Sequence, residues 1–259
     1  MEPVIRMQQI PADLTVRLLS EKVSLSAAWQ EKIDAHWERL LAEGKTYTRG
    51  ECFTVSDVVF EGERVEVLLK QTDYAHYLYT LHHKGELPAD VAIRVMYAAA
   101  LVETADGRLV FGEMGQQTGH PGRLQAIGGG LDFHDVEGDR LDLRGSLLRE
   151  LEEELGLDGT DAAVVKSVAP LYFKGGGDYD FLVVLYKVTL HLSAEAFLVR
   201  HRAFEREVRA RGEQPELSEL ILLPKDPQAV EAFLREDSRW RVDYLAPFLR
   251  VEAGLGTVD

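Results

Sequence analysis

Residues 127–157 read IGGGLDFHDVEGDRLDLRGSLLRELEEELGL, and the second half of this stretch predicts an amphipathic helix. Asp142 is a favourable N-cap and Gly156 suits the left-handed position that follows a helix, so we expect about three and a half turns between them. At about 100° per residue, one side of this helix is apolar and the other is acidic. The apolar side carries Leu148, Leu151 and Leu155, and the acidic side carries Glu150, Glu153 and Glu154.

The acidic side of this helix is electrostatically unfavourable unless a cation binds there. Residues three and four apart are neighbours on a helix, so Glu150 repels both Glu153 and Glu154. These acids also lie near the C-terminal end, where the helix dipole favours positive charge. A bound Mg²⁺ or Mn²⁺ would relieve both effects, because such ions bind carboxylate oxygens and keep waters that phosphate groups can replace. An ordinary solvent-exposed acidic face is the alternative, and it is the commoner explanation for a Glu-rich helix.

The pattern around the helix favours the metal site. Arg-Glu-Leu-x-Glu-Glu-x-Gly-Leu at residues 149–157, preceded by a glycine run, resembles the Nudix box, the signature of hydrolases that cleave nucleoside diphosphates linked to another moiety. The resemblance implies that Glu150 and Glu154 bind the metal ion together with the carbonyl of Gly128. It also implies that Glu153 is a metal ligand or the base that activates water, held by Arg149. The predicted catalytic residues are Arg149, Glu150 and Glu153, and the predicted metal ligands are Gly128, Glu150, Glu153 and Glu154.

The first half of the box departs from the family pattern. Nineteen residues, Gly130 to Leu148, separate Gly129 from Arg149, six more than the box usually has. Counting back from Arg149 places Leu141 where the family has its first glutamate. That glutamate is usually secondary to the three on the helix, so the insertion leaves the predicted metal site in place. The candidates to replace it are Glu137, Asp139 and Asp142, and it is equally open that no residue does.

Composition excludes several classes of protein. A formal net charge of -15 argues against a nucleic-acid-binding protein, since such proteins neutralise phosphates with Lys and Arg. Cys52 is the only cysteine, which excludes an intramolecular disulfide and zinc-finger spacing. The first residues lack the pattern of a signal peptide, and no apolar run is long enough to span a bilayer. We therefore expect a cytoplasmic protein that binds a small nucleoside diphosphate derivative and neither a nucleic acid nor a membrane.

The chain is long enough for one Nudix domain and an additional region, with 259 residues and 46% hydrophobic content. The resemblance implies an α/β/α sandwich on a mixed sheet for residues 91–259, and we expect residues 1–90 to form an N-terminal α+β extension. In that extension the sequence predicts a helix over residues 26–42 and a β-hairpin over residues 52–70. The sequence leaves open whether the extension binds substrate or forms a homodimer.

Aromatic and charged residues outside the box offer further candidates. The helix predicted over residues 193–211 carries five arginines, which more often form a solvated face than a lid over a diphosphate. The tyrosines at positions 74, 77 and 79 could stack on a base or sugar, although a half-buried packing surface is commoner. A loop carboxylate could join the site as ligand or base, and the candidates are Asp178, Asp180, Glu213, Glu216 and Glu219.

Substrate specificity in this superfamily comes from regions outside the box. The order of a helix, a hairpin, a tyrosine-bearing segment with Asp73-Tyr74 and the Nudix domain is similar to that of Nudix enzymes that hydrolyse UDP-glucose and UDP-galactose. An ADP-sugar or ADP-ribose substrate is a close competitor. A non-catalytic nucleotide-binding regulator is the alternative from another functional class, although degenerate boxes usually lose the glutamates that this chain keeps.

Overall fold

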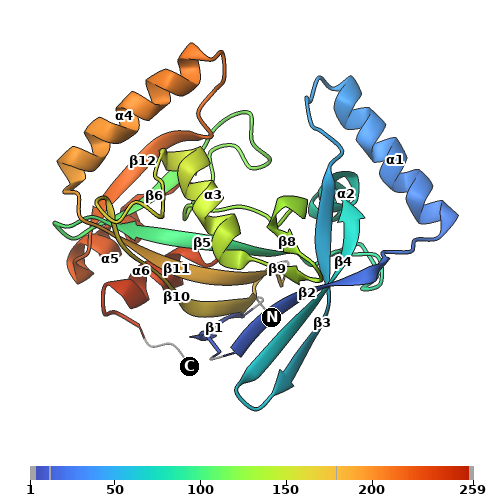
Figure 1. The fold of residues 1–259 in the computed structure, drawn as a ribbon. Coiled ribbons are helices and arrows are strands. Elements are labelled where there is room, and N and C mark those ends of the chain that lie inside the picture. Colours follow the sequence, from blue (N-terminus) through green and yellow to red (C-terminus); the bar gives the residue numbers. More distant parts are fainter. Residues whose placement is uncertain (1–3, 12, 84, 179, 257–259) are drawn as a thin grey trace.

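The computed structural model describes residues 4–11, 13–83, 85–178 and 180–256 and contains two β-sheets (Figure 1). The first sheet has seven strands, which are in spatial order β1 (Ile5–Gln9), β10 (Val165–Gly176), β11 (Leu182–Leu190), β5 (Met96–Glu103), β6 (Arg108–Met114) and β12 (Leu217–Pro224), with β7 (Leu124–Gln125) paired to β6. The second sheet has five strands, which are in order β3 (Glu51–Glu61), β4 (Arg64–Asp73), β2 (Asp13–Lys22), β9 (Arg140–Leu141) and β8 (Val136–Glu137).

Helices cover both faces of the first sheet. One face carries α3 (Leu143–Leu155) and α4 (Ala194–Ala210), and the other carries α5 (Pro227–Glu236) and α6 (Leu245–Glu252). The sheet is mixed, because β11 and β5 pair in parallel whereas the other neighbours pair antiparallel. The predicted α/β/α sandwich on a mixed sheet is therefore confirmed.

Strand β5 lies at the centre of this sandwich and is buried on both faces. Ala98, Ala100 and Val102 belong to the core cluster that contains α3, whereas Ala99 and Leu101 belong to the cluster that contains α5 and α6. Successive side chains of a strand point to opposite faces, so a strand covered on both sides needs a continuous apolar run. The residues from Met96 to Val102 supply that run.

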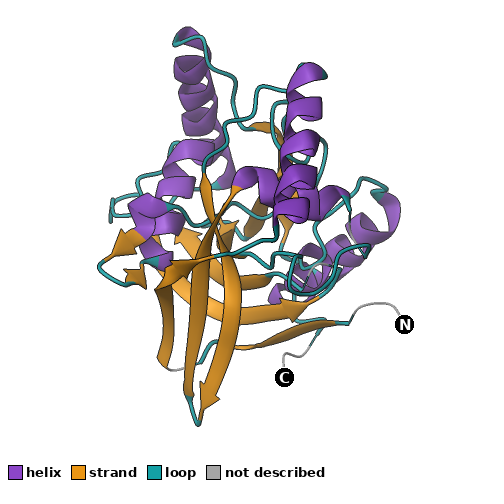
Figure 2. Cartoon of the chain, turned by 90° about the vertical axis from the view of Figure 1, so that its right-hand side faces the viewer, coloured by secondary structure: helices purple, strands orange, loops and turns teal. Residues whose placement is uncertain are grey.

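The second sheet joins segments that are far apart in the chain. Strand β2 pairs in parallel with β4 and antiparallel with β9, which forms a small hairpin with β8. The long segment before α3 is thus folded as a hairpin at the edge of the N-terminal sheet. In the opposite direction, β1 joins the first sheet by pairing with β10. The domain boundary at residue 90 stays a prediction. Strand β1, which precedes residue 90, belongs to the first sheet, and β8 and β9, which follow it, belong to the second. The longer β3–β4 hairpin extends away from the helices (Figure 2).

Two helices of the N-terminal region pack against each other. The helix predicted over residues 26–42 is α1 (Ala27–Ala42), whose N-cap is the Ser26 side chain. Its buried residues Ile33, Trp37 and Leu40 contact α2 (Tyr74–His82) in a separate core cluster. This side of α1 therefore serves packing. Within the described ranges, no helix is long and apolar enough to cross a bilayer.

Candidate metal centre

Helix α3 is fixed at both of its ends. The Asp142 side chain accepts a hydrogen bond of 3.0 Å from the Arg144 backbone N–H, and Gly156 adopts a φ of 67°. Both predicted ends are therefore confirmed. One side of the helix is also anchored, because Leu147, Leu151 and Leu155 are fully buried. Leu148, which we expected on the apolar side, is only partly buried against the same core cluster.

A glycine segment lies against the opposite side of α3. Ile127 exchanges backbone hydrogen bonds with Ala100 of β5, at 3.0 and 2.7 Å. Gly128 then has a φ of 147°, and a Cβ atom there would lie 2.2 Å from the Ala98 carbonyl oxygen. Only glycine tolerates both the backbone conformation and the close approach. The main chain therefore passes directly over the acidic side of the helix.

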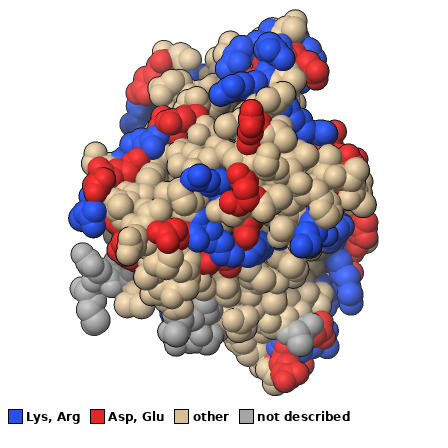
Figure 3. Space-filling view, turned by 90° about the vertical axis from the view of Figure 1, so that its left-hand side faces the viewer, with Lys and Arg blue, Asp and Glu red and all other residues tan. Residues whose placement is uncertain are grey.

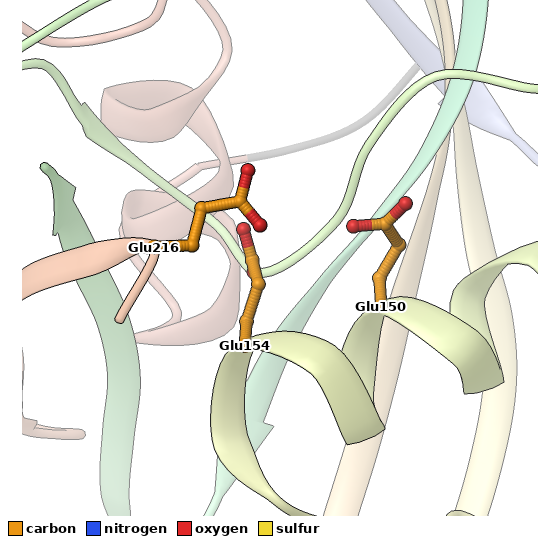
Figure 4. Close-up of side chains that lie close together, drawn as sticks. All are labelled: Glu150, Glu154 and Glu216. Carbon is orange, nitrogen blue, oxygen red and sulfur yellow. The ribbon is translucent and has the colours of Figure 1, made fainter. Parts of the chain in front are cut away.

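Three carboxylates converge beside this segment, as Figure 4 shows for Glu150, Glu154 and Glu216. One oxygen from each lies within 4.8 Å of the others. Glu150 and Glu154 are 7% and 3% exposed, and the Gly128 N–H donates to Glu154 Oε2 at 3.1 Å. Two acids come from α3, and the third comes from the residue that precedes β12. The structure thus brings together two of the three predicted helical glutamates, the predicted glycine and one loop acid.

The other four loop acids make different contacts. Asp180 pairs with Arg94 at 2.9 Å, Glu213 with Arg211 at 3.2 Å and Glu219 with Arg239 at 2.7 Å. Asp178 lines a separate cavity of about 250 Å³. Of the five candidates, the structure therefore places only Glu216 at the helical glutamates.

Arg149 bridges several of the acids around the site. Its Nη1 lies 3.2 Å from Glu150 Oε1 and 3.5 Å from Glu153 Oε2, and its Nη2 lies 3.2 Å from Asp135 Oδ2. The expected pairing of Arg149 with Glu153 is present. Asp135 is only 5% exposed and is the residue that our sequence reasoning missed. Its signal in the sequence is an Asp132-x-x-Asp135 capping box, which caps the N-terminal end of a short 3-10 helix.

None of the three proposed replacements for the first glutamate lines either cavity beside the clustered acids. Glu137 lies in strand β8 and is exposed. Asp139 pairs with Arg17 at 2.8 Å, and Asp142 caps α3. Spacing alone selected these residues, and it failed because the inserted segment folds back as the β8–β9 hairpin.

Glu153 stands apart from the other acids. Its side chain is 53% exposed, and it lies outside the group formed by Glu150, Glu154 and Glu216. It borders two cavities, one of about 530 Å³ and one of about 770 Å³, and Glu216 borders both as well. Its predicted role as ligand or base stays a prediction, and its position is suited to contact with solvent water.

The 530 Å³ cavity contains one guanidinium group among its lining residues, that of Arg123. Arg123 donates to Gln125 and lies 5.5 Å from the Trp240 ring centroid. Its buried Nε has no hydrogen-bond partner, and within the described part of the chain no carboxylate pairs with it. A cation without an ion-pair partner that lines the same cavity as a cluster of acids suits an anion that bridges the two.

The 770 Å³ cavity lies between α3 and α4. Arg149, Arg200 and Arg211 line it together with several acids. Figure 3 views the molecule from the left-hand side of Figure 1 and shows basic side chains gathered with acidic ones at the top, where α4 ends. Two arginines of this region have acidic neighbours, since Arg209 pairs with Glu205 and Arg211 with Glu213, both at 3.2 Å. These pairs are what a solvated helix face would show.

Burial and mutual repulsion raise the pKa of all three clustered acids. Burial, only partly offset by Arg149, raises the pKa of Glu150 to about 8. Burial followed by repulsion from Glu150 and Glu216 raises the pKa of Glu154 well above its usual value. Burial also raises the pKa of Glu216, with a contribution from Glu153. Since the described residues include no ion-pair partner for Glu154 or Glu216, a divalent cation fits the donor set and would restore the charged forms.

This arrangement predicts a pH-dependent stability that Mg²⁺ removes. Without a divalent ion, folded Glu150 keeps a proton that the unfolded chain releases, between its ordinary pKa of 4.5 and its folded pKa of about 8. The free energy of unfolding should therefore fall as pH rises through that window, by up to about 1.4 kcal/mol per pH unit for each such acid. Urea unfolding in EDTA and in excess Mg²⁺ measures both slopes. A free energy of unfolding that does not change with pH in EDTA would contradict the raised pKa of the clustered acids.

No family model matches the chain, and no curated protein matches it. Solved structures do match. DR0079 from Deinococcus radiodurans has 17% sequence identity and a TM-score of 0.40, with 75% of this chain and 96% of that chain covered. A Nudix hydrolase from Nitrosomonas europaea has 11% identity and a TM-score of 0.36, covering 62% and 88%. The pyrophosphohydrolase BsRppH from Bacillus subtilis has 14% identity and a TM-score of 0.35, covering 62% and 81%. The solved structures that this chain resembles thus include Nudix hydrolases, the family that its 149–157 motif resembles.

Proposed function

We propose that this protein is a hydrolase dependent on Mg²⁺ or Mn²⁺ that cleaves the pyrophosphate bond of a nucleoside diphosphate linked to another moiety. The observation that carries the proposal is the convergence of Glu150, Glu154 and Glu216 in a cavity with one unpaired guanidinium. A cluster of two buried acids and a more exposed third one suits a divalent cation, and Arg123 suits a phosphate group. Together they would bind the two charged partners of a metal-diphosphate complex.

The residues divide the chemistry between them. Glu150, Glu154 and Glu216 would hold the metal ion with the Gly128 carbonyl, and the bound ion supplies charge neutralisation and acidifies water. Glu153, which is more exposed, would accept the proton of the water that attacks phosphorus while the bridging P–O bond breaks. Arg149 orients Glu153 and Glu150 through its 3.5 Å and 3.2 Å contacts. Glu216 is the second candidate for the base.

Two cavities meet at the carboxylates, which suits a substrate with groups on both sides of a diphosphate. Glu153 and Glu216 border the 530 Å³ and the 770 Å³ cavities alike. A UDP-sugar is our first choice of substrate, and ADP-ribose or an ADP-sugar is the alternative. A non-catalytic nucleotide-binding module would use the same contacts without turnover.

An activity panel tests the proposal. Hydrolysis to two phosphomonoesters should occur with at least one of the UDP-sugars, ADP-sugars, ADP-ribose or NADH, with Mg²⁺ or Mn²⁺ present, and EDTA should abolish it because the acids alone repel the diphosphate. Coupling to a phosphatase that acts on the released monophosphates makes the product measurable. Silence across the panel, with nucleotide binding retained, would identify a binding module instead.

A further inference from the structure

We propose that the aromatic end of the 530 Å³ cavity is a nucleobase subsite that the N-terminal region builds with Tyr47, Tyr74 and Tyr77. The inference rests on the proposed hydrolase, since the diphosphate attached to that base must reach the clustered acids. It assigns residues 1–90 a part in recognising the nucleoside. The class of ligand is a nucleotide, with the base held by stacking.

The aromatic rings lie close together on one wall of the cavity. The Tyr74 ring centroid is 5.9 Å from that of Tyr47 and 5.4 Å from that of Tyr77, and Tyr77 is 6.3 Å from Phe181. All four residues line the cavity. Aromatic rings that line a cavity can stack on a flat base. Glu51 also lines the cavity, and its carboxylate, which accepts from Gln71 Nε2 at 2.6 Å, can accept a further hydrogen bond from a base edge.

Hydrogen bonds and an ion pair hold the backbone that carries Tyr74. Asp73 caps α2 by accepting from the His76 N–H at 2.9 Å, and Arg49 pairs with Asp73 at 2.8 Å. The Tyr74 N–H donates to the Gly50 carbonyl at 2.9 Å, which ties the start of α2 to the segment that carries Tyr47. A preorganised backbone lowers the entropic cost of binding a ligand there.

The aromatic end is continuous with the acids. Glu150 and Glu154 line the same cavity as the tyrosines, and Tyr74 Oη lies 3.1 Å from where a Cβ atom of Gly119 would sit, against the loop that closes the cavity. The cavity on the other side of Glu153 is lined mainly by charged and polar residues. Stacking surfaces therefore lie on one side of the diphosphate position, and that side is where the base would bind.

Calorimetric titration of the full chain in Mg²⁺ tests the subsite. The probes are the methylene analogues of ADP and UDP, which resist hydrolysis, and methylenediphosphonate, which lacks the nucleoside. Wild type should bind a nucleoside analogue about tenfold to a hundredfold more tightly than methylenediphosphonate. Tyr77→Leu and Tyr74→Leu should lose most of this advantage and keep the affinity for methylenediphosphonate. Tyr77→Phe and Tyr74→Phe, which keep the rings, are the matched controls, and melting temperatures verify folding.

The outcomes separate this inference from the proposed function. Equal affinity of wild type for all the probes would overturn the subsite, and so would an advantage that both leucine variants retain. Another outcome is that the nucleoside analogues bind equally well without a metal ion and that the leucine variants lose that binding. This result would support the subsite and contradict the metal-dependent hydrolase. Failure of every probe to bind would overturn both.

Discussion

Glu154→Gln is expected to lower kcat about 1,000-fold, which corresponds to about 4 kcal/mol of lost transition-state stabilisation. Glu154 is 3% exposed and lies between Glu150 and Glu216, so its charge is central to the proposed metal site. Glutamine keeps the shape and the acceptor for the Gly128 N–H but removes the negative charge that a divalent ion needs. Initial rates at saturating Mg²⁺, on the substrate that the activity panel identifies, measure the effect.

The same substitution should change stability in the opposite direction when no divalent ion is present. Burial raises the pKa of Glu154, which shows that its charged form is unfavourable in the metal-free fold. Glu154→Gln should therefore melt at a higher temperature than wild type in EDTA at alkaline pH, and Mg²⁺ should stabilise it much less than wild type. Glu137→Gln, at an exposed position of strand β8 that borders neither cavity, is the control and should leave kcat and the Mg²⁺ shift unchanged. A Glu154→Gln variant as active as wild type would exclude the metal site.

Local features of the site were predictable from the sequence because they depend on neighbours in the chain. Helix capping and 3.6-residue periodicity are local rules, and they identified Asp142, Gly156 and the buried pair Leu151 and Leu155. The glycine run was identified by its place before the helix, and its backbone conformation at Gly128 is one that favours glycine. Leu148, the third leucine expected on the apolar side, packs against the same core but is only partly buried, and Leu147 is fully buried in its place.

Features that depend on strand pairing were not predictable. Glu216 was one of five candidates, and what selects it is that β12 pairs with β6, with the Gly115 N–H donating to the Glu216 carbonyl at 2.7 Å. Asp135 is buried beside Arg149 because the inserted segment pairs with β2 through β9. Both contacts depend on residues far away in the sequence, and spacing along the chain does not encode such pairings.

Arg149→Met is expected to lower kcat about 100-fold and the free energy of unfolding by about 2 to 3 kcal/mol. Arg149 lies 3.2 Å from Asp135, whose side chain is only 4% exposed, so the substitution leaves a buried carboxylate without its cation. It also releases Glu150 and Glu153, which the guanidinium holds at 3.2 and 3.5 Å. Misplacing either carboxylate would cost rate while the metal ion can still bind. Steady-state kinetics and urea unfolding in EDTA measure the two effects.

Two further variants separate positioning by Arg149 from a simple effect of charge. Arg149→Lys keeps the positive charge but lacks the fork that contacts several acids at once, so it should regain part of the stability while kcat stays low. Arg144→Met removes an exposed arginine from the same helix and should change neither quantity. If Arg149→Met keeps the wild-type kcat, the guanidinium does not position the acids. If Arg149→Lys restores kcat fully, charge alone is sufficient, and the geometry of the fork has no part in the reaction.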